Sequence, residues 1–382
     1  MKKLIAMMLM LTMVFFIACD KDEDNNEMSP ADAKVALEEL NTDMSGYFDE
    51  MLNAEGVKAM EALMELPLDP FSGKKSNEPS AVLLNMQKLI LPSNYERTKI
   101  ALETGLFDFD SNVGTYTWNA TYEKWDVAHG VPSYKIIINF PTENSTTNDA
   151  TITISSYDET NIGEDYYPTE LAADLTIDNI EYVNIDFSAS WKTGGEPEIL
   201  SVEIYLNPFT FGGSFSNIGT TASVNFDIDY EEILIFAAGV GATFETTNWD
   251  NPPLNINGYI QLLNVKVEVD VNFENIAQII QDVENGTSTA TDLDELAEAI
   301  NAEIDAYVSV DGVKAVDIEF EFDRIFSDYS IPIDEEIGLY ININFVFSDG
   351  SIAPAYPYFE DFATDIEEFF SFLEEIFSGD SM

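Results

Sequence analysis

The stretch Val265–Phe273, which reads VKVEVDVNF, decides the fold class. Every second residue from Val265 onward is apolar, and the residues between them are Lys, Glu, Asp and Asn. Successive side chains of a β-strand point to opposite faces of a sheet, so this alternation predicts a strand with one apolar and one polar face. Such strands are typical of antiparallel sheets that are covered on one face and wet on the other.

The same period-two pattern recurs along most of the chain. Four further stretches show it: 183–191, 224–230, 316–322 and 339–347. Less regular strands are predicted at 115–118, 135–140, 151–155, 199–206 and 234–244. Three groups of turn residues separate strands: Thr193-Gly194-Gly195, Phe211-Gly212-Gly213 and Asn251-Pro252-Pro253. Residues 93–357 are therefore expected to form a large, mostly antiparallel sheet, either curved or built as a sandwich.

Residues 29–92 predict a helical segment before the sheet. Ser29 is a suitable N-cap and Pro30 a suitable first helical residue. Leu and Met side chains then recur at steps of three and four residues, which indicates a helix with one apolar stripe. The composition of residues 68–79 is that of a loop, and Ser80 is placed to cap a further helix.

Three other helices are predicted outside that segment. A short one is expected at 277–283 and a second at 292–307, both within the sheet region, and an amphipathic helix rich in Phe is expected at 358–378. The predicted fold class is thus α+β, a large mostly antiparallel sheet with an N-terminal helical segment and with helices packed on the sheet.

The first residues predict an export signal. Two lysines follow Met1, and a nearly unbroken apolar run then leads to Phe16-Ile17-Ala18-Cys19. Residues 1–18 have the layout of a secretory signal peptide. The last four residues of this stretch resemble the lipobox of bacterial lipoproteins, and this resemblance implies that Cys19 becomes a lipidated N-terminus that carries several acyl chains, palmitate among them. The alternative is a buried free cysteine, since Cys19 is the only cysteine of the chain.

Residues 19–28 form an acidic tether after that cysteine. Its first residues are Asp20, Lys21, Asp22, Glu23 and Asp24. This run resembles the tether of surface-exposed lipoproteins of Bacteroidota, and the resemblance implies a lipid-anchored outer-membrane protein that faces the cell exterior. The alternative is a merely solvated linker. The membrane, reached through the lipid, is accordingly one expected partner.

The charge of the chain limits its other partners. The sequence holds 71 acidic and 16 basic residues, for a net charge of −55. Such a charge argues against nucleic acid and against insertion into anionic lipid surfaces. Divalent cations such as Ca²⁺ would screen it without a dedicated site, and no cofactor is expected.

The sequence offers no clear catalytic group. His129 is the only histidine, so a multi-histidine metal site is excluded, and no Gly-x-Ser-x-Gly motif occurs. Gly239-Val240-Gly241 lacks the third glycine of a dinucleotide-binding loop. With 71 acids, the sequence cannot single out the carboxylate pair of a glycosidase. We therefore predict no catalytic and no metal-ligating residue.

The densest aromatic patch is Gly114–Trp125, GTYTWNATYEKW. It predicts a hairpin of two aromatic strands, on which Trp118, Tyr122 and Trp125 are candidates for stacking against a ligand such as a sugar. Ordinary packing of the sheet accounts for the same residues.

These observations favour a lipid-anchored surface protein that acts as a non-catalytic binding or structural module, with a glycan, a protein or an assembly partner as its ligand. The alternative is a carrier or chaperone for lipids or other apolar ligands, held in a groove between sheet and helices. A hydrolase that uses two carboxylates is a third hypothesis.

Overall fold

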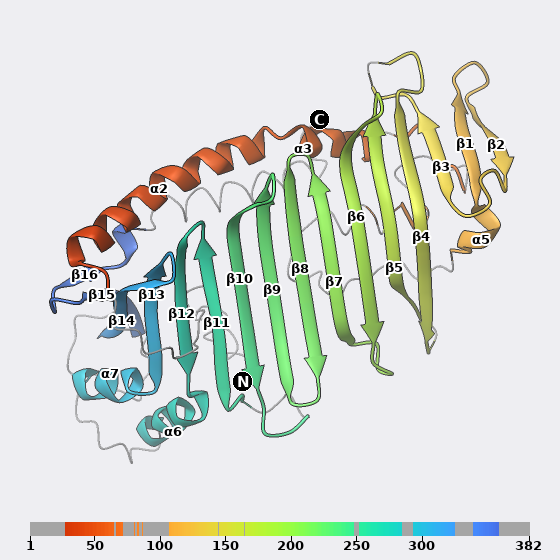
Figure 1. Cartoon of the computed structure of the whole chain (residues 1–382). Helices are drawn as coiled ribbons and strands as arrows, with labels where there is room; N and C mark the ends of the chain where they lie inside the picture. Colours follow the sequence, from red (N-terminus) through yellow and green to blue (C-terminus); the bar gives the residue numbers. More distant parts are fainter. Residues whose placement is uncertain are drawn as a thin grey trace. The chain divides into compact units, whose positions relative to one another are not determined.

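The computed structural model describes residues 27–64, 66–71, 80, 82–83, 86, 107–143, 145–163, 165–247, 252–284, 293–324 and 339–358 (Figure 1). The predicted signal peptide, Cys19, Asp20–Asp24 and nearly all of the predicted helix 358–378 lie outside these residues.

A mostly antiparallel sheet of 16 strands dominates the fold, as predicted (Figure 1). The strands run in the order β16-β15-β14-β13-β12-β11-β10-β9-β8-β7-β6-β5-β4-β3-β1-β2. Their bounds are β1 Gly114–Asn119, β2 Lys124–His129, β3 Ile136–Phe140, β4 Ala150–Ile162, β5 Asp165–Ile177, β6 Ile180–Trp191, β7 Pro197–Leu206, β8 Phe209–Ile218, β9 Thr221–Tyr230, β10 Ile233–Thr243, β11 Asn255–Leu262, β12 Val265–Val271, β13 Ile304–Val310, β14 Val313–Arg324, β15 Leu339–Phe347 and β16 Ile352–Pro354. The order is sequential except at the β1–β2 end, where β1 pairs in parallel with β3.

The helices whose bounds fall within the described residues are α2 Pro30–Leu52, α3 Glu55–Met64, α5 Phe109–Asn112, α6 Phe273–Glu284, α7 Leu293–Asn301 and the 3-10 helix η2 Tyr356–Tyr358. Within the described part of the chain, no helix is both long enough and apolar enough to cross a bilayer.

The chain divides into two compact units. The first comprises Met1–Ser45, Asn217–Phe226 and Leu234–Ala363, and the second comprises Gly46–Ser216, Asp227–Ile233 and Thr364–Met382.

The second unit buries one face of its strands. Ile136, Ile138 and Phe140 of β3 stand opposite Ile154, Ile152 and Ala150 of β4, and all six side chains are fully buried. Residues between them are partly exposed, which is the period-two pattern expected of a strand with one covered face. The burial of this apolar face is the main source of stability for the unit.

Helix α3 meets the link between β7 and β8. The Gly56 amide donates a hydrogen bond of 2.9 Å to the carbonyl of Asn207, and a Cβ on Gly56 would overlap the backbone of Leu206 and Asn207. The helical segment breaks between Leu52 and Glu55, and Gly56 lies within the first turn of α3, where a glycine permits this close approach.

A buried aspartate organises the loop after α3. Asp69 is 1% exposed, and its carboxylate accepts hydrogen bonds from the amides of Phe71, at 2.8 Å, and of Ser80. The predicted capping role of Ser80 is not seen, because its hydroxyl is buried without a partner among the described residues. Val82, Leu83 and Met86, which follow Ser80, are helical and buried, in agreement with the predicted apolar stripe.

The first unit contains the start of α2. The Ser29 hydroxyl accepts from the Asp32 amide at 3.3 Å and donates to the Asp32 carboxylate at 2.6 Å, so Ser29 is the predicted N-cap. The Met28 amide donates to the carbonyl of Lys314 at 2.8 Å, and the Lys34 ammonium lies 4.5 Å from the centre of the Phe347 ring. These contacts join the N-terminal residues of the helix to β14 and β15.

The strand in the stretch VKVEVDVNF is shorter than its alternating pattern predicts. Strand β12 ends at Val271, and Phe273 begins α6. The Asn272 side chain accepts from the amide of Asn275 at 3.4 Å, which is the capping contact that favours Asn before a helix.

The predicted helix 292–307 is wrong in its second half. Helix α7 ends at Asn301, and Ile304–Val310 form β13. Ala306, Val308 and Val310 are buried at alternate positions, which outweighs the helical spacing of Ile300 and Ile304 in the sequence. The amide group of Asn301 donates to the carbonyl of Phe320 at 2.8 Å and accepts from its amide at 3.0 Å, and it thereby supplies two backbone groups of β14 with partners.

The predicted turn Phe211-Gly212-Gly213 is also wrong, because these residues lie inside β8. The Asp227 carboxylate on β9 occupies the space that a side chain at Gly212 would need. Glycine here leaves room for a neighbouring side chain and does not reverse the chain.

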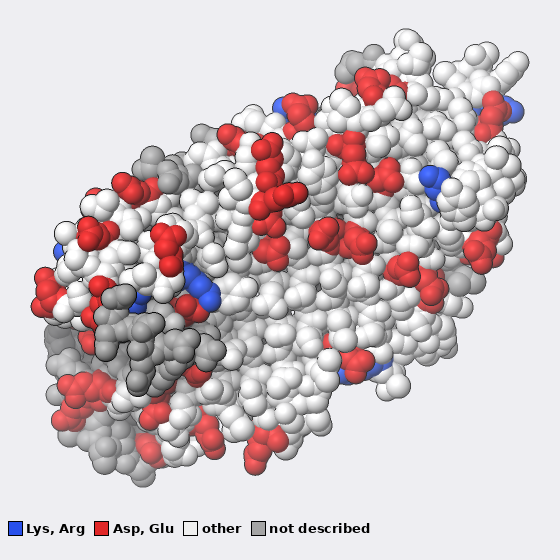
Figure 2. All heavy atoms as spheres, viewed as in Figure 1, with Lys and Arg blue, Asp and Glu red and all other residues white. Residues whose placement is uncertain are grey.

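Acidic side chains outnumber basic ones on the face of the molecule that Figure 2 shows. Figure 2 shows Asp and Glu spread over the viewed face, among far fewer Lys and Arg, as the net charge of −55 requires.

Candidate functional site

The hairpin of β1 and β2, in the second unit, gathers the candidate residues. Its register places Trp118 opposite Trp125 and Asn119 opposite Lys124, which confirms the predicted hairpin. The residues between the strands form a short loop. The side-chain oxygen of Asn119 accepts hydrogen bonds from the backbone amides of Thr121, at 3.2 Å, and Tyr122, at 3.3 Å. Asn is favoured at such a position because its short side chain bonds the backbone two residues on.

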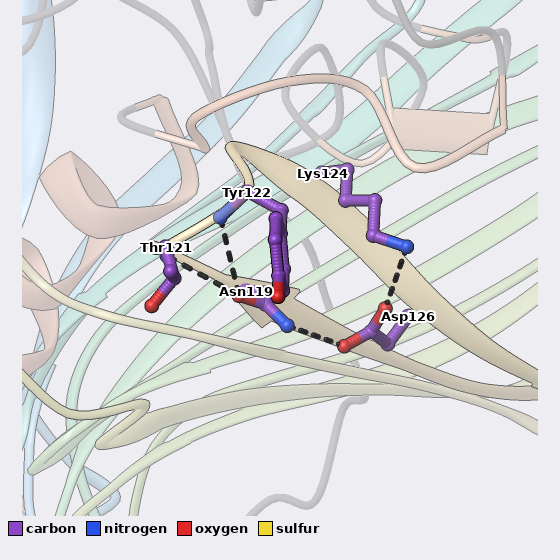
Figure 3. A network of polar contacts seen from close by, with 5 residues as sticks. All are labelled: Asn119, Thr121, Tyr122, Lys124 and Asp126. Atoms are coloured by element: carbon purple, nitrogen blue, oxygen red, sulfur yellow. Dashed lines mark hydrogen bonds and ion pairs between the residues drawn. The ribbon is translucent and has the colours of Figure 1, made fainter.

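A polar network extends from this loop along one face of the hairpin (Figure 3). The Asn119 amide nitrogen donates to Asp126 at 2.7 Å, and the Lys124 ammonium lies 3.2 Å from the other oxygen of that carboxylate. The hydrogen bond from Asn119 and then that from Lys124 hold the pKa of Asp126 below its ordinary value. Asp126 is therefore ionised at neutral pH, on an exposed surface.

Tyr122 stands on the loop beside this network (Figure 3). Its side chain is 71% exposed, and the Lys124 ammonium lies 5.8 Å from the centre of its ring. A cation at this distance from an aromatic face is weakly attracted to it. The loop thus presents an exposed ring next to one ammonium and one carboxylate.

The two tryptophans have different surroundings. Their ring centroids are 5.3 Å apart at an interplanar angle of 67°, an edge-to-face contact. The Trp125 indole N–H donates to the carbonyl of Leu68 at 3.1 Å, and both side chains are half-buried. Because strand residues alternate between faces, this pair lies on the face opposite Asn119 and Lys124. Of the three predicted stacking residues, the structure thus brings Trp118 and Trp125 together and leaves Tyr122 with the polar network.

An uncommon link holds the hairpin against the sheet. The chain leaves β2 at His129 and passes through residues 130–135 to β3, which is parallel to β1. The Thr115 hydroxyl donates to the Val131 carbonyl at 2.6 Å, and the Gly130 amide donates to the Val113 carbonyl at 2.8 Å. Gly114 has a φ of 146° and a Cβ there would overlap the Ala128 carbonyl, so only glycine suits this crossing point.

Sequence reasoning missed the polar members of the site. Asn119 and Asp126 belong to no recognisable sequence motif. The hydrogen bond between them depends on the register of β1 and β2, which is known only once the length of the loop is known. The available signal was Asn119 at the end of an aromatic strand, followed by a short polar loop.

The remaining candidates lie elsewhere. His129 ends β2, exposed, with its ring 6.2 Å from that of Tyr116. Among the described residues, no three His, Cys, Asp or Glu side chains gather as around a metal ion. Cys19 and the tether Asp20–Asp24 fall outside the described ranges.

Comparison with known proteins adds little. No family model and no curated protein matches the chain. A solved structure described as a porin-like protein from Bacteroides vulgatus ATCC 8482 is similar over 58% of this chain and 95% of its own, with 8% sequence identity and a TM-score of 0.20. A similarity at this TM-score carries no argument about fold or function.

Proposed function

We propose that the protein is a non-catalytic, lipid-anchored cell-surface protein that binds a glycan at the β1–β2 hairpin. The observation that carries the proposal is the exposed Tyr122 ring beside the Asn119–Asp126–Lys124 network. An aromatic ring offers a flat apolar surface for the C–H face of a sugar, and charged groups beside it can bond the hydroxyls.

The unused hydrogen-bonding capacity of the network favours a hydroxyl-rich ligand. The Asn119 side-chain oxygen already accepts from two amides, and its nitrogen donates one of its two N–H groups to Asp126. Asp126 retains lone pairs on both oxygens, and Lys124 retains N–H donors. A ligand that both donates to a carboxylate and accepts from an ammonium fits this pair, and two neighbouring hydroxyl groups do both.

The test is a glycan array with the full chain carrying Cys19→Ala, followed by titration of each hit. We expect binding to at least one glycan, weakened at least tenfold in Tyr122→Ala and in Asp126→Asn. Tyr134→Ala is the matched control, because Tyr134 is 69% exposed and lies on the adjoining link outside the network. An empty array, or a Tyr122→Ala chain that binds as well as the parent, would overturn the proposal.

The anchor is the second part of the proposal. Its support is the lipobox-like Cys19 followed by the acidic run Asp20–Asp24. Two or more acyl chains hold a protein stably at a membrane, whereas one chain does not. Labelled palmitate should enter the parent chain and not the Cys19→Ala chain. Protease added to intact cells should remove the protein from the outer surface, and protection until the outer membrane is broken would contradict surface exposure.

We also propose that helices cover the apolar face of the sheet and that a glycan, not a lipid carried in a groove, is the ligand. Fully buried Leu37 and Met51 on α2 support such a cover. The carrier alternative stays a prediction, because the predicted helix 358–378 that would help to close a groove lies almost wholly outside the described residues.

A further inference from the structure

Strand β2 lies at one end of the described strand order, and one row of its backbone groups faces no described strand. It has β1 as its neighbour on one side, and no described strand lies on the other (Figure 1). The bond from the Gly130 amide to the Val113 carbonyl fixes which residues of β2 bond to β1, because such pairs recur every second residue. Lys124, Asp126 and Ala128 therefore face β1 with their backbone groups, and the three residues between them, Trp125, Val127 and His129, face outward.

This edge carries little of the usual protection against pairing. Edge strands are normally shielded by proline, by bulges, by short length or by charged side chains. β16, the other end of the strand order, is three residues long and ends in Pro354. β2 has six residues in unbroken register with β1, contains no proline, and carries its two charges as an ion pair between Lys124 and Asp126.

We infer that two copies of this chain join edge to edge through β2, antiparallel to one another about a twofold axis at Val127. In this register Val127 stands opposite Val127 of the second copy, and Trp125 stands opposite His129 of the second copy. Each of these pairs exchanges two N–H···O=C bonds, so every outward backbone group of the strand finds a partner. The interface is isologous, as in most dimers.

The charges favour a second copy as the occupant. The outward row Trp125, Val127 and His129 contains no acid, in a chain whose net charge is −55. On the other face of the strand, Asp126 stands opposite Ala128 of the second copy and keeps Lys124 as its own counter-ion. The net charge of −55 opposes the association of two copies at long range, and salt weakens this repulsion between exposed charges beyond the Debye length of about 8 Å at physiological ionic strength.

Val127 is the residue that tests the symmetry. It is 39% exposed, so a polar replacement is compatible with folding. Because residue 127 meets itself at the axis, Val127→Glu alone or Val127→Lys alone places two like charges opposite each other, which is destabilising across strands. A mixture of the two variants places opposite charges there instead.

The experiment is sedimentation velocity of the Cys19→Ala chain over a concentration series at physiological salt. We expect a monomer–dimer equilibrium that is weakened more than tenfold in Val127→Glu and in Val127→Lys and restored in their equimolar mixture. Ile180→Glu, an added charge at a 52% exposed site on β6, is the matched control and should dimerise like the parent. Thermal unfolding of each variant shows whether it is folded.

Three results would overturn the inference. The first is a parent chain that remains monomeric throughout the series. The second is dimerisation of the folded Val127 variants to the same extent as the parent, and the third is a mixture of the two variants that does not restore the dimer. Capture of an extended peptide by a monomeric parent chain would assign the edge to a different occupant. None of these results depends on glycan binding, because Tyr122 and its network are unchanged in every variant.

Discussion

The backbone of Gly56 lies directly against that of Asn207, with a hydrogen bond of 2.9 Å from the Gly56 amide to the Asn207 carbonyl. A Cβ on Gly56 would overlap the backbone nitrogen of Asn207, which cannot swing away as a flexible side chain can. Helix α3 is thus fixed against the β7–β8 link at a distance that only glycine permits.

Gly56→Ala is therefore expected to lower the free energy of unfolding, by about 1–3 kcal/mol, since overpacking of a tight contact forces the backbone to move. Urea unfolding of the Cys19→Ala chain measures this. Gly46→Ala is the matched control in a neighbouring helix, because nothing lies within 4 Å of a Cβ at Gly46. Alanine there should stabilise α2 by about 1 kcal/mol. Equal effects of the two substitutions would show that the Gly56–Asn207 contact is not tight.

Asp69 is expected to be the most sensitive acid of the loop after α3. Asp69→Ala removes the acceptor for the amides of Phe71 and Ser80 in a buried site, and unsatisfied buried amides cost about 1–3 kcal/mol. Asp69→Asn keeps one acceptor oxygen and should lose less. Chemical denaturation compares both with Asp110→Ala, an exposed aspartate of α5 whose loss should change stability by less than about 0.5 kcal/mol. A result for Asp69→Ala no larger than this control would contradict the prediction.

The regular strands could be predicted because their sequences alternate. Val183–Trp191 and Leu339–Phe347 were expected as strands, and β6 and β15 contain them. Strand β8 was not predicted, because Gly212 and Gly213 are residues typical of a turn. The glycine at position 212 is explained only by the carboxylate of Asp227 on the next strand, which occupies the space of a side chain. Such cross-strand reasons are invisible until the strand order is known.

The hairpin could be predicted, and its polar site could not. Trp118 and Trp125 stand in the expected pairing, since aromatic residues on two short strands favour it. The parallel pairing of β1 with β3 has no counterpart in the local pattern, because it depends on where residues 130–135 cross. The separation of Tyr122 from the tryptophans follows from its place in the loop.

Asn301 is expected to stabilise the first unit through its paired contact with Phe320. Asn301→Ala removes one donor and one acceptor from the β14 backbone, and we expect a loss of about 1–3 kcal/mol in the free energy of unfolding. Asn301→Asp keeps the acceptor and sets a carboxylate oxygen against the Phe320 carbonyl, so it should be at least as harmful. Asn264→Ala is the control, because the Asn264 amide bonds Asp311 on an exposed surface. Equal stability of Asn301→Asp and the parent would exclude the donor contact.

Asp227 is expected to make the stability of the second unit depend on pH. Burial, and then the charges of Asp229 and Glu203, raise the pKa of Asp227 above its ordinary value of 3.8. A raised folded-state pKa stabilises the protein most below the ordinary value, and this contribution is lost as the pH rises through the folded-state pKa. At pH 7 this group therefore lowers the free energy of unfolding, and Asp227→Asn should raise that free energy by up to about 1 kcal/mol, the size of an interaction between partly exposed charges.

The matched control is Asp126→Asn, for which the expected change in the free energy of unfolding has the opposite sign. The pKa of Asp126 is lowered by its bonds with Asn119 and Lys124, so its contribution is present above the ordinary value and is lost as the pH falls. Asp126→Asn should therefore be less stable than the parent at pH 7, while Asp227→Asn is more stable. Urea unfolding at a series of pH values between 7 and 4 should show the Asp227→Asn difference shrinking toward the acid end, whereas the Asp126→Asn difference should persist over this range, because it is lost only below the ordinary pKa of 3.8. An Asp227→Asn chain that is less stable than the parent at pH 7 would mean that its carboxylate makes favourable contacts that outweigh its burial.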